Sequence, residues 1–138
     1  MASQAAELFM AFMDAHDMKV NMVSEEHNLI RAGLGLENTQ LAAYFQFDPD
    51  DESAHIEGRE FAQIPKDQVE KIYKICNSLN DSYRWVKFVW DEEASDLCCR
   101  VDAVIQLDSC AQEMYELMAR MAGIVDDAYP KIMKALWA

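Results

Sequence analysis

Three histidines lie near acidic residues, and such pairs are the first candidates for proton transfer or metal binding in this sequence. They are His16, His27 and His55. An imidazole beside a carboxylate can act as a general base or bind a metal ion. None of the three belongs to an H-x-x-x-H or H-E-x-x-H spacing, which would place two ligands on one helix face. We therefore expect surface histidines at helix ends and strand edges, and we assign no catalytic residue.

The acidic segment 48–53 is a second candidate, because it combines four carboxylates with a proline. Hard cations such as Ca²⁺ bind several carboxylate oxygens from one loop, and the loop needs a glycine at its sixth position. Ser53 stands at that position here. We expect an exposed acidic turn, with no metal site and no cofactor.

Four cysteines could carry redox chemistry, but they show no CxxC spacing and no histidine pair that would complete a zinc site. They are Cys76, Cys98, Cys99 and Cys110. Cys98 and Cys99 are neighbours on a predicted strand, so their side chains should point to opposite faces. We expect Cys99 to be buried and Cys98 to point outward beside Arg100, whose charge would lower the pKa of the thiol. Cys98 is thus a candidate redox-sensitive thiol, the alternative being an inert, half-buried residue.

The elements that must position these residues follow from hydrophobic periodicity. Apolar residues spaced by three and four predict helices near 3–16, 67–79 and 114–136. Alternation predicts strands near 28–36, 41–47, 83–91 and 97–107, with weaker ones near 19–23 and 55–61. Pro130 cannot donate to the carbonyl of Asp126, so we expect a kink or a new helix start there.

Strand runs joined by hairpins predict an α+β fold with one antiparallel sheet and flanking helices on one face. The expected order is α-β-β-β-α-β-β-α. The 138 residues and 51% hydrophobic content suit a single domain, which we assign to residues 1–138.

The net charge and the first residues of the chain restrict the expected partners and location. The formal net charge of -13 repels phosphate backbones and anionic lipids, so we expect neither nucleic acid nor membrane as a partner. The first residues lack the basic start of a secretory signal, and apolar runs such as 8–13 are too short to cross a bilayer. We expect a cytoplasmic protein.

The outward side of the sheet is the candidate binding face. Alternation gathers aromatic and basic side chains there: Arg31, Tyr44, Trp85, Lys87 and Arg100. Aromatic residues and arginine are favoured as anchors of protein interfaces. The alternatives are an ordinary solvated sheet, or a face covered by a helix or a dimer partner. The helical spacing of Met114, Met118 and Met121 favours core packing over a binding groove.

Several segments resemble the YbjN family, whose members are described as putative bacterial sensory transduction regulators. The segments that carry the resemblance are Leu34–Thr39, Ile64-Pro65, Leu79-Asn80 and Asp127–Trp137. The resemblance implies a bacterial cytosolic protein with a fold similar to that of type III secretion chaperones, which are small, acidic, usually dimeric and bind extended segments of client proteins.

From this resemblance we expect a non-enzymatic interaction module that acts as a regulator or chaperone-like protein. Its partner would be a protein of unknown identity, and the module would form a homodimer. The alternative from the residues is a small-ligand-binding or enzymatic domain that uses a cavity between the helices and the sheet.

Overall fold

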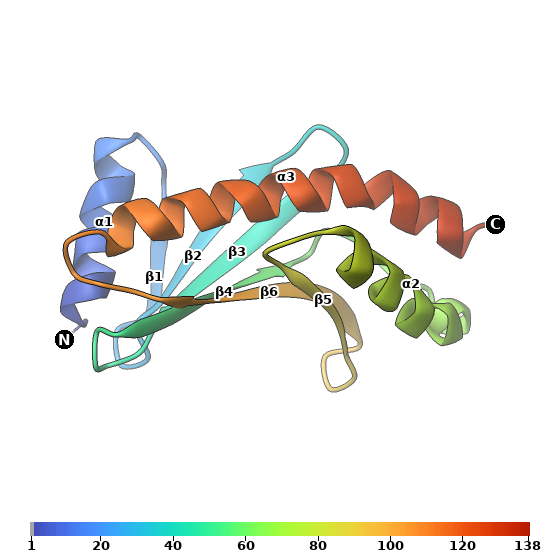
Figure 1. Cartoon of the computed structure of the whole chain (residues 1–138), viewed down its shortest axis with the longest axis horizontal. Helices are drawn as coiled ribbons and strands as arrows, with labels where there is room; N and C mark the ends of the chain where they lie inside the picture. The colour runs from blue at the N-terminus through green and yellow to red at the C-terminus, as the bar shows by residue number, and fades with distance from the viewer. Residues whose placement is uncertain (1) are drawn as a thin grey trace.

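The computed structural model describes residues 2–138, so the N-terminal residue of the expected domain lies outside the described residues. The elements in chain order are α1 (Gln4–Ala15), β1 (Asn21–Ser24), β2 (Leu29–Gly35), β3 (Gln40–Phe47), β4 (Ser53–Arg59), a 3-10 turn (Lys66–Gln68), α2 (Val69–Ser82), β5 (Lys87–Asp91), β6 (Asp96–Val104) and α3 (Cys110–Leu136). The long α3 lies across the sheet, with α1 near its N-terminal end and α2 near its C-terminal end (Figure 1).

All strand pairs are antiparallel, and the sheet has the order β1-β2-β3-β4-β6-β5. This confirms the α+β class with one antiparallel sheet and flanking helices. Both weaker stretches form strands, β1 and β4, so four strands lie between α1 and α2 where the expected order has three.

The core lies between the sheet and the helices α1 and α3. The ring of Phe9 on α1 is centred 4.6 Å from that of Phe45 and 5.6 Å from that of Phe47, both on β3. The three methionines of α3 named above, Met114, Met118 and Met121, are also buried. Their predicted role in core packing is confirmed.

The acidic segment 48–53 holds the start of α1. Asp51 Oδ1 accepts from the backbone N–H of Ala5 at 3.0 Å, and the Ser53 hydroxyl donates to Asp48 Oδ2 at 2.5 Å. A carboxylate near a helix N-terminus satisfies backbone N–H groups that have no partner within the helix. Within residues 2–138, no group of three or more His, Cys, Asp or Glu side chains is placed to hold a metal ion.

Pro130 does not start a new helix, because α3 continues through it from Cys110 to Leu136. The carbonyl of Asp126, which loses its helical partner there, accepts from the side-chain amide of Asn38 at 3.1 Å. The backbone N–H of Asn38 donates to Asp126 Oδ1 at 2.7 Å. The β2–β3 turn therefore supplies the hydrogen bond that the proline removes, and the helix needs no break.

The polar side of α2 protects the edge of the sheet at β5. Asn80 Nδ2 donates to the carbonyl of Phe88 at 3.1 Å, and the N–H of Phe88 donates to Asn80 Oδ1 at 2.6 Å. These two bonds replace those of a neighbouring strand, so this part of the edge is not open to strand addition.

Candidate interaction surface

The strand register brings four of the five predicted binding residues into one row across the sheet. Arg31 on β2 lies opposite Tyr44 on β3, and Tyr44 lies opposite Glu57 on β4. Glu57 lies opposite Arg100 on β6, which pairs with Lys87 on β5. We call the side of the sheet that carries this row the outer sheet face.

The helices α1 and α3 leave the outer sheet face uncovered, because they pack on the other side. Phe45 and Phe47 contact Phe9 of α1, and they alternate along β3 with the outward Tyr44 and Gln46. Solvent reaches the row: the side chains of Arg31 and Arg100 are 35% and 34% exposed, and that of Lys87 is 58% exposed.

Carboxylates pair with every basic side chain of the row. Arg31 lies 3.7 Å from Glu60, and Lys87 lies 3.8 Å from Asp102. Arg100 lies 3.3 Å from Glu57. The outer sheet face is therefore charge-balanced, which corrects the picture of a basic and aromatic patch. Sequence alternation identified the basic residues, but their acidic partners come from other segments of the chain.

Arg59 joins the carboxylates at the centre of this network. It contacts Glu57, lies 2.7 Å from Asp91 and lies 3.5 Å from Asp96. The hydrogen bond from Arg59, together with the backbone N–H of Ala94, holds the pKa of Asp91 below its usual range. Burial instead raises the pKa of Asp96, although the charge of Arg59 opposes this. Arg59 was not among the predicted binding residues.

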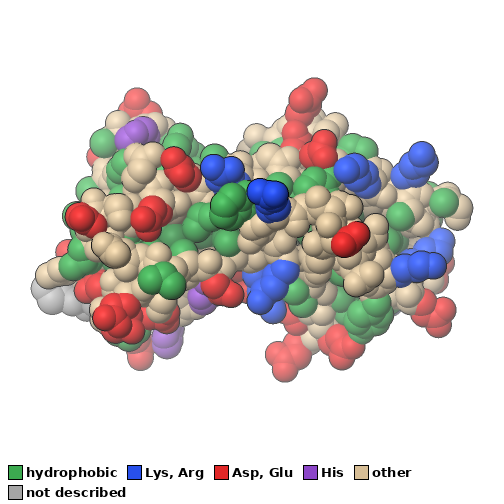
Figure 2. All heavy atoms as spheres, in the orientation of Figure 1, with side chains coloured by type: hydrophobic (Ala, Val, Ile, Leu, Met, Phe, Trp, Pro, Cys, Tyr) green, Lys and Arg blue, Asp and Glu red, His purple; other side chains and the backbone are tan. Residues whose placement is uncertain are grey.

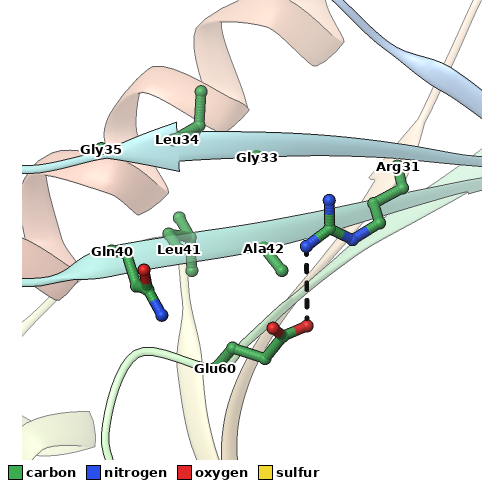
Figure 3. A pocket seen from close by; sticks show the side chains of 8 residues that line it. All are labelled: Arg31, Gly33, Leu34, Gly35, Gln40, Leu41, Ala42 and Glu60. Atoms are coloured by element: carbon green, nitrogen blue, oxygen red, sulfur yellow. Dashed lines mark ion pairs between the residues drawn. The ribbon is translucent and has the colours of Figure 1, made fainter.

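The outer sheet face has a hollow where glycines leave it without side chains. The hollow has a volume of about 270 Å³ and is lined by residues that include Gly33, Gly35, Gln40 and Ala42. Arg31 and Glu60 point toward each other across one side of it (Figure 3). A side chain added at Gly35 would meet no atom within 4 Å at its Cβ, so the hollow is open space.

Trp85, the fifth predicted binding residue, does not belong to the outer sheet face. It lies between α2 and β5 with a φ of 75°, and the guanidinium of Arg120 on α3 stacks over its ring at 4.9 Å. The left-handed backbone breaks the alternation that would have placed Trp85 beside Lys87. The side chain remains 55% exposed, on the helix side of the molecule.

Cys98 points to the predicted side of its strand but is fully buried, which corrects the expectation of an exposed thiol. It lies on the same side of β6 as Arg100, with Val89 of β5 as its strand partner. Burial raises the pKa of its thiol, and the nearby charges of Arg100 and Arg59 oppose this only in part. Cys99 is buried as expected, and all four cysteines are free thiols.

A second surface feature, missed by the sequence interpretation, lies between α2 and the last turns of α3. Lys71, Lys74 and Lys131 line this groove of about 500 Å³. The lysines of α2 could have been noticed as one helix face, but α3 contributes the opposite wall from sixty residues away. We call this groove the basic trough.

No helix among residues 2–138 is long and apolar enough to cross a membrane.

Comparisons with known proteins bear on both fold and family. The crystal structure of YbjN from E. coli superposes with a TM-score of 0.64 at 10% identity, covering 91% of each chain. A chain of the HopA1–SchA chaperone–effector complex superposes with a TM-score of 0.51 at 17% identity, covering 89% of this chain and 94% of that one. At these identities the two structures show a shared fold.

Among curated proteins, none matches the chain. The family model of YbjN, with the description "Putative bacterial sensory transduction regulator", matches residues 5–132. Because this match spans nearly the whole chain, the protein belongs to the YbjN family.

Proposed function

We propose that this protein is a non-enzymatic interaction module that binds another protein through its outer sheet face. The observation that carries the proposal is the uncovered row of Arg31, Tyr44, Glu57, Arg100 and Lys87, which crosses five strands. A regulator or a chaperone-like protein would both use such a surface.

The chemistry of the row supports a protein as the ligand. Arginine and tyrosine are favoured anchors at interfaces, and a mixed-charge surface suits the mixed polarity of a polypeptide. Ion pairs within the face hold the side chains in place, so less conformational entropy is lost on binding. The hollow beside Arg31 offers room for one side chain of the partner.

The comparison with solved structures supports the same class of function by fold. The HopA1–SchA structure is a complex of a chaperone with an effector, so a chain of this fold is found bound to another protein. The resemblance is at the level of fold, and the partner of the present protein is not implied by it.

The alternative of a catalytic or ligand cavity between helices and sheet lacks support. That layer is filled by apolar side chains, including Phe9, Phe45, Met114 and Met121. Among residues 2–138, Asn28 is the one buried polar residue, and it hydrogen-bonds to the backbone of Ser3 and Phe47. An active site would need at least two convergent titratable groups.

Location and oligomeric state remain expectations. We expect the protein to work in the cytoplasm and to form a homodimer, as the resemblance implies. The net charge of -13 keeps nucleic acid and anionic membranes as disfavoured partners.

The proposal is tested by placing a photocrosslinking amino acid at Gln40, an exposed residue that lines the hollow. The matched position is Glu116, which is exposed on α3. After irradiation in an extract of the source bacterium, we expect an adduct with another protein at Gln40 and none at Glu116.

Two glycine variants show whether the adduct depends on the hollow. Gly35→Phe fills it and should abolish the adduct, whereas Gly123→Phe, at an exposed helical glycine with equally open space, should leave it unchanged. An adduct that survives Gly35→Phe, that forms equally at Glu116, or that contains only a second copy of this chain overturns the proposal.

A further inference from the structure

The basic trough runs between two antiparallel helices that are tied together at both ends. Near the start of α2, Lys71 Nζ donates to the carbonyl of Leu136 at 2.9 Å. At the other end, Tyr83 donates to Asp127 Oδ2 at 2.5 Å, and Lys131 Nζ donates to the Tyr83 hydroxyl at 2.8 Å. These cross-links hold the helices apart at a set distance, so the trough between them is a built feature of the fold.

The floor of the trough is apolar, and its rim is basic. Ile75 and Leu79 of α2 and Ala135 of α3 line the floor. The lining also includes three lysines and one acidic residue, Glu70, and one of the lysines, Lys131, is paired with Asp127 at 3.5 Å; the chain as a whole has 12 basic and 25 acidic residues. On the face that Figure 2 shows, Lys and Arg side chains lie over the middle of the molecule and the end that carries α2 and the C-terminal part of α3, together with acidic side chains, whereas the end around α1 shows acidic side chains without Lys or Arg.

The ammonium group of Lys74 is available to a ligand. It forms no ion pair within residues 2–138, and it lies between the two cross-linked ends. The overall negative charge of the protein attracts cations, so an anion is attracted only where the local charge is positive. The positive rim therefore favours a negatively charged ligand.

The dimensions of the trough select a thin ligand. Its lining on α2 extends from Glu70 to Ser82, which at 1.5 Å per residue is about 18 Å. The volume of about 500 Å³ spread over that length leaves a mean cross-section of about 28 Å². A helix, with a diameter of about 10 Å or more, could only rest on the rim. One aliphatic chain can lie inside.

We propose that the basic trough binds a single-chain amphiphile with an anionic head group, of the fatty-acid class. The aliphatic tail lies over Ile75, Leu79 and Ala135, and the carboxylate accepts hydrogen bonds from the lysine ammonium groups at the rim. The trough is separate from the outer sheet face, so this binding does not depend on the proposed protein interaction.

The probe for the test is decanoate below its micellar concentration, titrated by calorimetry and by two-dimensional NMR of the full chain. We expect amide shifts confined to α2 and the last turns of α3. Affinity should rise from octanoate to dodecanoate by up to about fourfold per methylene, because each buried methylene adds about 0.8 kcal/mol. Decanol and decyltrimethylammonium should bind more weakly than decanoate.

Matched variants separate the rim from the floor. Lys74→Glu should weaken decanoate binding about fivefold or more, because it replaces an attractive charge with a repulsive one. Lys66→Glu, at an exposed lysine outside the trough, should leave binding unchanged. Ser78→Phe fills the trough and should abolish binding, whereas Asn77→Phe, at the adjacent exposed position outside the lining, should not.

Four outcomes overturn the inference: no dependence on chain length, equal binding of decyltrimethylammonium, equal effects of Ser78→Phe and Asn77→Phe, or binding to phosphatidylglycerol vesicles without binding to free decanoate. Loss of the Gln40 photocrosslink would not affect any of them, so failure of the proposed function and failure of this inference are distinguishable.

Discussion

At the scale of single residues, Arg59 organises the outer sheet face. It bridges Asp91 at 2.7 Å and Asp96 at 3.5 Å, and it also contacts Glu57. The two aspartates respond in opposite ways: the pKa of Asp91 is lowered chiefly by the hydrogen bond from Arg59, whereas that of Asp96 is raised chiefly by burial. A single arginine thus contacts one carboxylate whose pKa is set chiefly by hydrogen bonds and one whose pKa is set chiefly by burial.

These opposite shifts predict opposite pH dependences for two asparagine variants. An aspartate whose pKa is lowered by folding stabilises the protein above its unfolded-state pKa of about 4, and this stabilisation is lost as pH falls through the folded-state pKa. Asp91→Asn should therefore lower the free energy of unfolding at pH 7, and the difference from the unsubstituted protein should shrink below about pH 4.

Asp96→Asn is the contrasting variant. Because folding raises the pKa of Asp96, the charged form is disfavoured in the native state, and its replacement should be neutral or stabilising at pH 7. Urea unfolding of both variants at pH 7 and pH 3 measures the differences. Equal destabilisation by the two variants at pH 7 would show that the pKa shifts are not the source of their effects.

At the scale of elements, two residues from the segments that carry the family resemblance join separate elements of the fold. Asn38 supplies the bond that Pro130 denies to Asp126, and Asn80 protects the edge of β5 at Phe88. Asn38 joins the β2–β3 turn to α3, and Asn80 joins α2 to β5. These hydrogen bonds give both asparagines a structural role.

The tie between Asn38 and α3 can be measured with a double-mutant cycle. Asn38→Ala should lower the free energy of unfolding by about 1 kcal/mol, because the carbonyl of Asp126 loses its hydrogen bond. The loss should be smaller in a Pro130→Ala background, where the N–H of residue 130 can donate to that carbonyl.

Glu37→Ala, at the adjacent exposed position of the same turn, should change stability by less than about 0.5 kcal/mol. Urea denaturation gives all the values. An Asn38→Ala loss that is equal in both backgrounds would contradict the coupling.

At the scale of the whole molecule, close contact between the sheet and α3 depends on Gly58. A Cβ at this position of β4 would lie 2.6 Å from Cys99 Sγ, 2.9 Å from Leu41 Cδ1 and 3.0 Å from Met121 Sδ. These atoms belong to two neighbouring strands and to the helix above them. The lack of a side chain lets three elements meet at one point.

Gly58→Ala should therefore lower the free energy of unfolding by about 1–3 kcal/mol, the usual cost of overpacking a filled core. Gly33→Ala, on the open outer sheet face, should be tolerated because its Cβ would lie 3.5 Å from the nearest atom, Arg31 Nη1. Cys99→Ala should recover part of the loss in the Gly58→Ala background, since it removes the nearest atom. Thermal and urea unfolding measure the series, and equal effects at the two glycines would contradict it.

Local pattern was enough to predict the class of the fold and the facing of most side chains. Side-chain direction alternates along any strand, so the outward positions of Arg31, Tyr44, Lys87 and Arg100 could be read from the sequence. Hydrophobic periodicity also predicted the three helices and the sheet that they cover, because a helix and a strand each repeat their apolar residues at a characteristic spacing. The prediction fails at Trp85 because a positive φ breaks the period there.

Pairing and burial, in contrast, depend on segments that are distant along the chain. The acidic partners that balance the outer sheet face come from other segments of the chain, the bond that lets α3 pass Pro130 comes from the β2–β3 turn, and the basic trough needs both α2 and α3. Cys98 points to the side that alternation predicted, yet neighbouring groups bury it. The sequence by itself determined which way each strand residue faces. Only the tertiary structure decided which residues each side chain contacts. Periodicity sets the direction of side chains within one element, and it carries no information about the element packed beside it.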